Sequence, residues 1–217
     1  IRSRLKLQHC DKLAVYIGSA GEGRGLDIIL KAVNLIPALH LAFLGIHSES
    51  EAAIYLKNIV RREKLSVRLY FISPIPNDKI TMFIAGANVS LIATQDICLN
   101  HKFSMPNKLF ESAFAGVPIV STPIQSTSNF INELGIGEVA SDYGYISYSK
   151  AIRIVLDNNK SYYNLISTEK LKDNYGWLAQ EKKMLQHLNY INRYMENKSD
   201  LIKEQAKLTK AIIEWKP

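Results

Sequence analysis

The stretch LAVYIGSAGEGRGLDIILKAVNLI, residues 13–36, decides the fold of this chain. It begins with an apolar run of strand length, LAVYIG (13–18), and passes through a glycine-rich loop into LDIILKAVNLI (26–36), whose apolar residues have helical spacing. Glycines allow close backbone approach, and a helix N-terminus attracts negative charge. The stretch therefore predicts a strand, an anion-binding loop and a helix in succession.

The same alternation of strand and helix continues to about residue 158. Apolar runs predict further strands at 39–45, 67–72, 88–94, 117–122 and 137–140. Helical patterns lie at 49–64, 77–87, 106–116, 127–134 and 150–158. The predicted strands are apolar throughout instead of alternating, which is typical of a parallel sheet covered on both faces. We therefore predict an α/β fold with a doubly wound, Rossmann-like parallel sheet.

From Gly176 onward the sequence has no strand signal. Apolar residues recur at helical spacing on one long helix and again on a second, and the two stripes are Trp177, Met184, Leu188, Ile191 and Met195, then Leu201, Leu208, Ile212 and Trp215. We predict two domains, a Rossmann-like domain at 1–174 and C-terminal amphipathic helices at 175–217. These helices are expected to dock on a protein core, with a partner domain or a membrane surface as the alternatives.

The composition is that of a globular protein, with 47% hydrophobic and 22% charged residues among 217. No apolar run is long enough for a transmembrane helix, and the N-terminus does not resemble a signal peptide. Cys10 and Cys98 have no metal-type spacing, so we expect reduced, packed cysteines and a cytoplasmic protein. The start of the sequence resembles an interior piece of a longer chain.

The net charge of +7 is uneven along the chain. Residues 1–149 hold 14 basic and 12 acidic side chains, whereas residues 150–217 hold 13 and 8. The basic excess can face water or the anionic inner face of a membrane. Basic stretches interleaved with aromatic residues are missing, so we do not expect nucleic-acid binding.

The glycine-rich loop GSAGEGRG (18–25) follows the first predicted strand, at the edge where parallel sheets bind ligands. Arg24 adds a cation that can hold a phosphate through two hydrogen bonds. The glycine spacing is not the G-x-G-x-x-G of a dinucleotide site, the second strand does not end in an acidic residue, and no Walker motif follows. The loop is a candidate phosphate site or a glycine-rich turn with a solvated arginine.

A second loop, FISPIPNDK (71–79), follows the third predicted strand. Its two prolines stiffen it and are expected to expose Ile75. Such a loop can pack on a flat base, although an ordinary turn has the same composition.

The segment PNKLFESAFAG (106–116) predicts a helix with two faces, because Pro106 suits a first helical turn. One face is apolar and consists of Leu109, Phe110, Ala113 and Phe114; the other consists of Lys108, Glu111, Ser112 and Ala115. Lys108 and the free amide groups can hold a phosphate, and Glu111 can accept hydrogen bonds from a ribose. The alternative is a surface ion pair of little energetic weight.

Together these residues resemble the C-terminal half of a GT-B glycosyltransferase, and most of all glycosyltransferase family 4. The likeness covers about residues 1–195. The matching segments are YIGSAGEGRGLDIILKAV (16–33), PNKLFESAFAGVPIV (106–120), which has the family's Pro-x-Lys-x-x-Glu and Ala-x-Gly-x-Pro, and the closing helix YGWLAQEK (175–182).

The resemblance implies that this half binds a nucleoside-diphosphate sugar, linked to UDP or GDP. It gives catalytic roles to Arg24, Lys108 and Glu111. The nucleotide-binding residues that it implies are Gly18, Ser19, Arg24, Gly25, Ile75, Lys108, Leu109 and Glu111, and the candidates for contact with the sugar are Asn100, His101 and Phe103. His101 is equally compatible with a solvated loop position.

The sequence departs from the family pattern at two positions. Ser19 stands where many members have an arginine directly after the first glycine, which removes one phosphate cation. Phe103 stands eight residues before Glu111, where many members have a second glutamate. We expect the contacts to the sugar to differ more from the family than those to the nucleotide.

The implied activity is transfer of a hexose-type sugar, with retention, to a glycan or lipid-linked acceptor in cell-surface polysaccharide or capsule synthesis. The acceptor-binding N-terminal half would be a separate partner, and this fragment alone is expected to be inactive. The sequence shows no Asp-x-Asp and no clear metal cluster, so we expect neither a metal nor a cofactor, with cations stabilising the leaving diphosphate instead.

Three other functions are compatible with these patterns. A nucleotide-sugar epimerase of GT-B fold would need acid–base carboxylates in its cleft. A non-catalytic module would bind a nucleotide and hold a partner through its C-terminal helices. A basic membrane-docking domain would bind vesicles.

Overall fold

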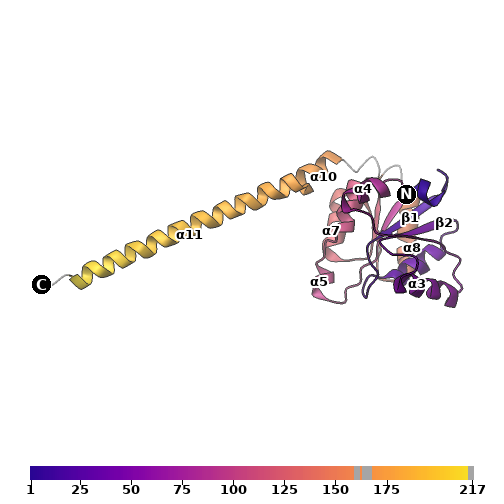
Figure 1. Cartoon of the computed structure of the whole chain (residues 1–217), viewed down its shortest axis with the longest axis horizontal. Helices are drawn as coiled ribbons and strands as arrows, with labels where there is room; N and C mark the ends of the chain where they lie inside the picture. The colour runs from indigo at the N-terminus through magenta and orange to yellow at the C-terminus, as the bar shows by residue number, and fades with distance from the viewer. Residues whose placement is uncertain (159–161, 163–167, 215–217) are drawn as a thin grey trace. The chain divides into compact units, whose positions relative to one another are not determined.

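The computed structural model of the chain describes residues 1–158, 162 and 168–214. Six parallel strands form one sheet in the order β3-β2-β1-β4-β5-β6 (Figure 1). The strands are β1 (Lys12–Ile17), β2 (Leu39–Leu44), β3 (Arg68–Ile72), β4 (Val89–Ile92), β5 (Ile119–Ser121) and β6 (Gly137–Val139). The predicted doubly wound parallel sheet is confirmed.

Strand β1 lies inside the sheet and fixes its register. It pairs with β2 from Lys12 opposite Leu39 to Ile17 opposite Leu44. On its other side it pairs with β4, with Ala14 opposite Val89. The chain order reverses between β1 and β4, and in sheets of this kind ligands bind beyond the carboxyl ends of the strands at that point.

Helices cover both faces of the sheet. Their bounds are α1 (Arg2–Leu5), α2 (Leu26–Asn34), α3 (Glu51–Arg62), α4 (Asn77–Ile84), α5 (Leu99–Lys102), α6 (Asn107–Phe114), α7 (Gln125–Leu134), α8 (Tyr145–Asp157), α10 (Thr168–Tyr175) and α11 (Trp177–Glu214). One apolar core joins the sheet to α2, α3 and α8, and a second lies under α4. Because both faces are packed, the strands are apolar throughout, as the sequence indicated.

The chain divides into two compact units, Ile1–Thr168 and Glu169–Pro217. In the second unit, α11 is one continuous helix of 38 residues, with side chains 182–207 exposed. The prediction of a separate helix at Leu201 is therefore wrong, since no glycine or proline interrupts the segment. The side chains of Leu208 and Ile212, and all of Trp215, lie outside the described residues.

Both cysteines differ from expectation. Cys10 and Cys98 are free thiols, but both are exposed, so the prediction that they are packed is wrong. Each lies in a loop or at a helix cap, where hydrophobicity of a single residue does not decide burial. None of the described helices is both long and apolar enough to cross a membrane.

Candidate functional site

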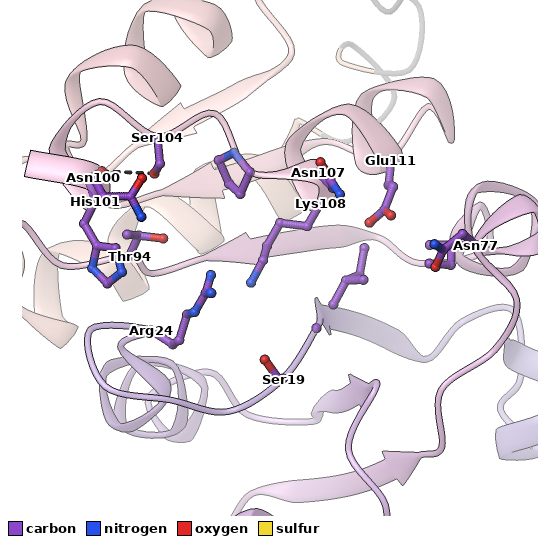
Figure 2. A pocket seen from close by; sticks show the side chains of 14 residues that line it. Ser19, Arg24, Asn77, Thr94, Asn100, His101, Ser104, Asn107, Lys108 and Glu111 are labelled. Atoms are coloured by element: carbon purple, nitrogen blue, oxygen red, sulfur yellow. Dashed lines mark hydrogen bonds between the residues drawn. The ribbon is translucent and has the colours of Figure 1, made fainter.

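A pocket of about 470 Å³ opens at the carboxyl ends of β1 and β4, where the strand order reverses (Figure 2). Its walls come from the loop after β1, the start of α4, the loop after β4 and the first turns of α6. The lining residues are Ile17, Gly18, Ser19, Arg24, Asn77, Ile80, Thr94, Asn100, His101, Ser104, Pro106, Asn107, Lys108 and Glu111.

Lys108 is the most unusual of these side chains, because it is a cation that is only 7% exposed. Its ammonium Nζ lies 3.9 Å from the centroid of the Tyr16 ring, on β1 below it. Burial lowers the pKa of Lys108 to about 7, the nearby Arg24 lowers it further, and Glu111 partly opposes both. An anion bound beside Lys108 would restore its charge.

The burial of Lys108 follows from how α6 is seated on the sheet. Ser112 is fully buried, and its Oγ lies 2.6 Å from both Ser90 Oγ on β4 and the Lys108 carbonyl oxygen. The expectation of an open face with Lys108 and Ser112 on it is therefore wrong. A serine on the strand supplies the partner that lets this polar face of the helix pack against the sheet.

Arg24 enters the pocket from the glycine-rich loop (Figure 2). The loop ends at Gly25, which is the N-cap of α2 and has a left-handed φ of 61°. A Cβ atom at Gly25 would lie 2.0 Å from the Ala93 carbonyl oxygen, so only glycine fits. This close approach of the loop to the end of β4 places Arg24 beside Lys108.

The floor of the loop is held by Tyr16. Its hydroxyl donates a hydrogen bond of 2.8 Å to the Ser19 carbonyl oxygen. Burial raises the pKa of Tyr16 to about 12, although Arg24 opposes this rise. The hydroxyl therefore stays protonated at neutral pH and keeps the backbone at Ser19 in place.

Glu111 lies at one end of the pocket, near Asn77 and Asn107 (Figure 2). It is half-buried, and burial raises the pKa of its carboxyl group while Lys108 lowers it. It is the only carboxylate among the residues that line the pocket in the described part of the chain. At neutral pH this end is an acceptor of hydrogen bonds, and the middle of the pocket is cationic.

The opposite end of the pocket is lined by Thr94, Asn100, His101 and Ser104 (Figure 2). His101 Nδ1 is 3.2 Å from the Gln95 carbonyl oxygen, and the Gln95 amide donates to the Gly23 carbonyl oxygen at 2.8 Å. A Cβ atom at Gly23 would lie 2.5 Å from His101 Cε1. The glycine-rich loop and the loop after β4 are thus fixed against each other.

The structure brings together most of the residues that the sequence nominated. Seven line the pocket, namely Gly18, Ser19, Arg24, Asn100, His101, Lys108 and Glu111. Four do not line it: Gly25 caps α2, the Leu109 amide donates to the Pro106 carbonyl oxygen, Ile75 packs on the apolar core under α4, and Phe103 is 56% exposed. Ile75 is thus only partly exposed, because that core covers one side of it.

Sequence reasoning missed several lining residues. Thr94 ends the predicted fourth strand, and Asn77 and Asn107 begin helices after their strands. Their positions at strand and helix ends were a usable signal, because such positions gather at the ligand-binding edge. Among the described residues, no group of three His, Cys, Asp or Glu side chains is placed to hold a metal ion.

Solved structures share this fold. A sucrose-phosphate synthase from Thermosynechococcus elongatus superposes with a TM-score of 0.72 at 17% identity, over 89% of this chain and 48% of that one. HepE from Anabaena, solved with UDP and glucose, gives a TM-score of 0.69 at 13% identity, over 87% and 51%. The C-terminal domain of the group 1 glycosyl transferase LpcC from Francisella tularensis gives 0.59 at 12%, over 76% and 87%.

The fold and the pocket at its switch point are those of a GT-B glycosyltransferase, as the sequence predicted. The sequence profile of the glycosyl transferases group 1 family matches residues 1–172, and the chain belongs to this family. It spans about half the length of the first two solved structures. No curated protein matches its sequence.

Proposed function

We propose that this chain is the donor-binding half of a glycosyltransferase that takes a hexose-type sugar from UDP or GDP. The observation that carries the proposal is the order of groups along the pocket (Figure 2). Arg24 and Lys108 lie in the middle, Glu111 lies at one end, and neutral polar side chains with His101 lie at the other. A diphosphate between the two cations would present its ribose to Glu111 and its sugar to His101.

The charges suit the departure of a nucleoside diphosphate. Negative charge develops on the leaving phosphate as the glycosidic bond breaks, and cations already in place stabilise it without reorganisation. Arg24, Lys108 and the N-terminus of α6 provide that charge. We therefore propose transfer that needs no divalent metal and no cofactor, with retention at the anomeric carbon as the family resemblance implies.

Glycosyltransferase family 4 and the acceptor belong to the same proposal. The acceptor would be a glycan or a lipid-linked saccharide in cell-surface polysaccharide synthesis, bound by an N-terminal GT-B half. A single carboxylate in the described pocket lining favours transfer over epimerisation, for which two acid–base groups are required.

Calorimetric titration with UDP, GDP, UDP-glucose and GDP-mannose tests the proposal. Lys108→Met should weaken binding of the preferred nucleotide about 10- to 100-fold, because it removes a charge-assisted contact to phosphate while keeping most of the side-chain volume. Lys12→Met is the matched control, since Lys12 is exposed at the start of β1, away from the pocket.

Unchanged nucleotide affinity of the Lys108→Met protein would sink the assignment of the diphosphate site. Binding that disappears on addition of a chelator would contradict the metal-independent part. Nucleotide binding without any transfer, once an N-terminal half is supplied, would identify a non-catalytic module instead.

A further inference from the structure

A second groove lies at the outer edge of the sheet, away from the donor pocket. It has a volume of about 530 Å³ and runs between the last turns of α3 and strand β3, which pairs with β2 only. We call it the α3 groove, and its lining residues are Lys57, Val60, Arg61, Lys64, Leu65, Leu69 and Phe71. Three cations thus stand over four apolar side chains, with no acidic residue among them.

The positive charge of this region is concentrated. Residues 57–68 contain five Lys and Arg residues and a single acidic one, Glu63. The Glu63 carboxylate is 3.3 Å from Lys31 Nζ and 3.3 Å from Arg62 Nη2, so it is engaged with cations outside the groove. The potential of Lys57, Arg61 and Lys64 is therefore not cancelled by a carboxylate in the groove itself.

Helix capping accounts for only part of this arrangement. Cations near a helix C-terminus are stabilised by the helix dipole, which applies to Arg61 at the end of α3. Lys57 lies more than one turn earlier and gains little from it. Its ammonium instead donates to the Ser48 carbonyl oxygen at 2.8 Å and lies 5.4 Å from the centroid of the Phe71 ring.

Apolar surface continues from the groove along α3. Ile54 shares a helix face with Lys57 and Arg61, at positions i, i+3 and i+7, and is 50% exposed. Within the groove, Val60, Leu65, Leu69 and Phe71 are only partly buried on the main core. A ligand with both an anionic and an apolar part would match this surface, whereas free phosphate would use the cations alone.

We propose that the α3 groove is a docking site for anionic phospholipid of a membrane surface. The lipid phosphates would contact Lys57, Arg61 and Lys64, and Ile54 with the apolar floor would lie against the acyl region. This site is distinct from the donor pocket and does not depend on the proposed transferase activity.

The test is sedimentation of the full chain with vesicles of phosphatidylcholine, with and without phosphatidylglycerol. The wild type should bind the anionic vesicles only, and high salt should release it. A triple variant, Lys57→Gln with Arg61→Gln and Lys64→Gln, should lose at least about tenfold in vesicle affinity. The matched control carries Lys198→Gln, Lys203→Gln and Lys207→Gln on α11, which removes the same charge elsewhere.

The outcomes separate this site from its rivals. Loss of binding in the α3 variant with binding kept in the control supports the proposal. Equal loss in both variants, loss in the control alone, binding to neutral vesicles, or no vesicle binding at all would overturn it. Release by millimolar inorganic phosphate at constant ionic strength would point to a soluble anion as the ligand and would also overturn it. Circular dichroism checks that the variants, which change exposed side chains, stay folded.

Discussion

At the scale of single residues, the chemistry of the pocket depends on a lysine that the fold keeps partly uncharged. The pKa of Lys108 is lowered to about 7 by burial and by Arg24. A bound diphosphate places negative charge beside it and raises this pKa again. Binding above pH 7 is therefore coupled to uptake of a proton.

This coupling predicts how donor affinity depends on pH. Below pH 7 Lys108 is already protonated, so its contribution to UDP-glucose binding is constant. As the pH rises above 7, the free protein must gain a proton to bind, and the affinity should fall by up to about tenfold per pH unit. Calorimetry at several pH values measures this slope.

The control for the pH dependence is the Lys108→Met protein, whose affinity should be flat across the same range. A wild type that binds equally well at pH 7 and pH 9 would contradict the shifted lysine. At the acid end, burial raises the pKa of Glu111, so its carboxylate is lost at a higher pH than that of a solvated glutamate.

At the scale of elements, the site depends on two loops that lock together. Gly23 has a φ of 71°, and its carbonyl accepts from the Gln95 amide. His101 and Ile97 of the second loop lie so close that a Cβ atom at Gly23 would be 2.5 Å from each. The glycine is required by both its backbone conformation and its neighbours.

Gly23→Ala should therefore destabilise the protein by about 1–2 kcal/mol and displace His101. We expect a greater loss of affinity for UDP-glucose than for UDP, because His101 lies at the end of the pocket assigned to the sugar. Thermal unfolding and calorimetry measure the two effects.

Gly21→Ala is the matched control in the same loop. Its Cβ would meet only Arg24 Cγ at 3.8 Å, an ordinary contact, so little should change. Gly23→Ala protein with wild-type affinity for UDP-glucose would show that His101 does not contact the sugar.

The elements themselves were largely predictable, and the burial of polar residues was not. The predicted strand at 39–45 is β2, Leu39–Leu44, because an unbroken apolar run identifies a strand buried on both faces. The four-residue helix α5 was missed, since it is too short to show a period. The buried position of Ser112 depends on Ser90, a strand residue 22 positions away, which helical spacing does not reveal.

At the scale of the whole molecule, the two compact units differ in how their side chains are packed. Strands β1 and β2 bury every residue except Lys12, whereas residues 182–207 of α11 are all exposed. A helix without buried contacts is held mainly by its own hydrogen bonds and propensities.

Amide hydrogen exchange should reflect this difference. Amides in α11 should exchange at least about 100-fold faster than those in β1 and β2, since local opening is cheap where few contacts are lost. Mass spectrometry of peptides from the exchanged protein measures both regions. Equal protection that persists on dilution would contradict the exposed helix, and protection that disappears on dilution would identify self-association.

The site could be predicted further than its details. The phosphate loop and the helix beginning at Pro106 were recognisable because their residues serve the ligand within a few positions. Thr94 and Ser104 were not, because their place in the pocket depends on how the loop after β4 folds back over Gly23. Phe103 shows the same limit, since counting residues placed it near the sugar and the fold exposes it.

The lowered pKa of Lys108 has a consequence for chemical labelling. At pH 7 about half of the molecules hold this amine uncharged, and an uncharged amine is a nucleophile. It stands in the wall of an open pocket, beside Arg24, which attracts anions. A nucleotide that carries an aldehyde or an activated ester would be drawn to this one amine and attach there covalently, giving a selective reagent for the donor site.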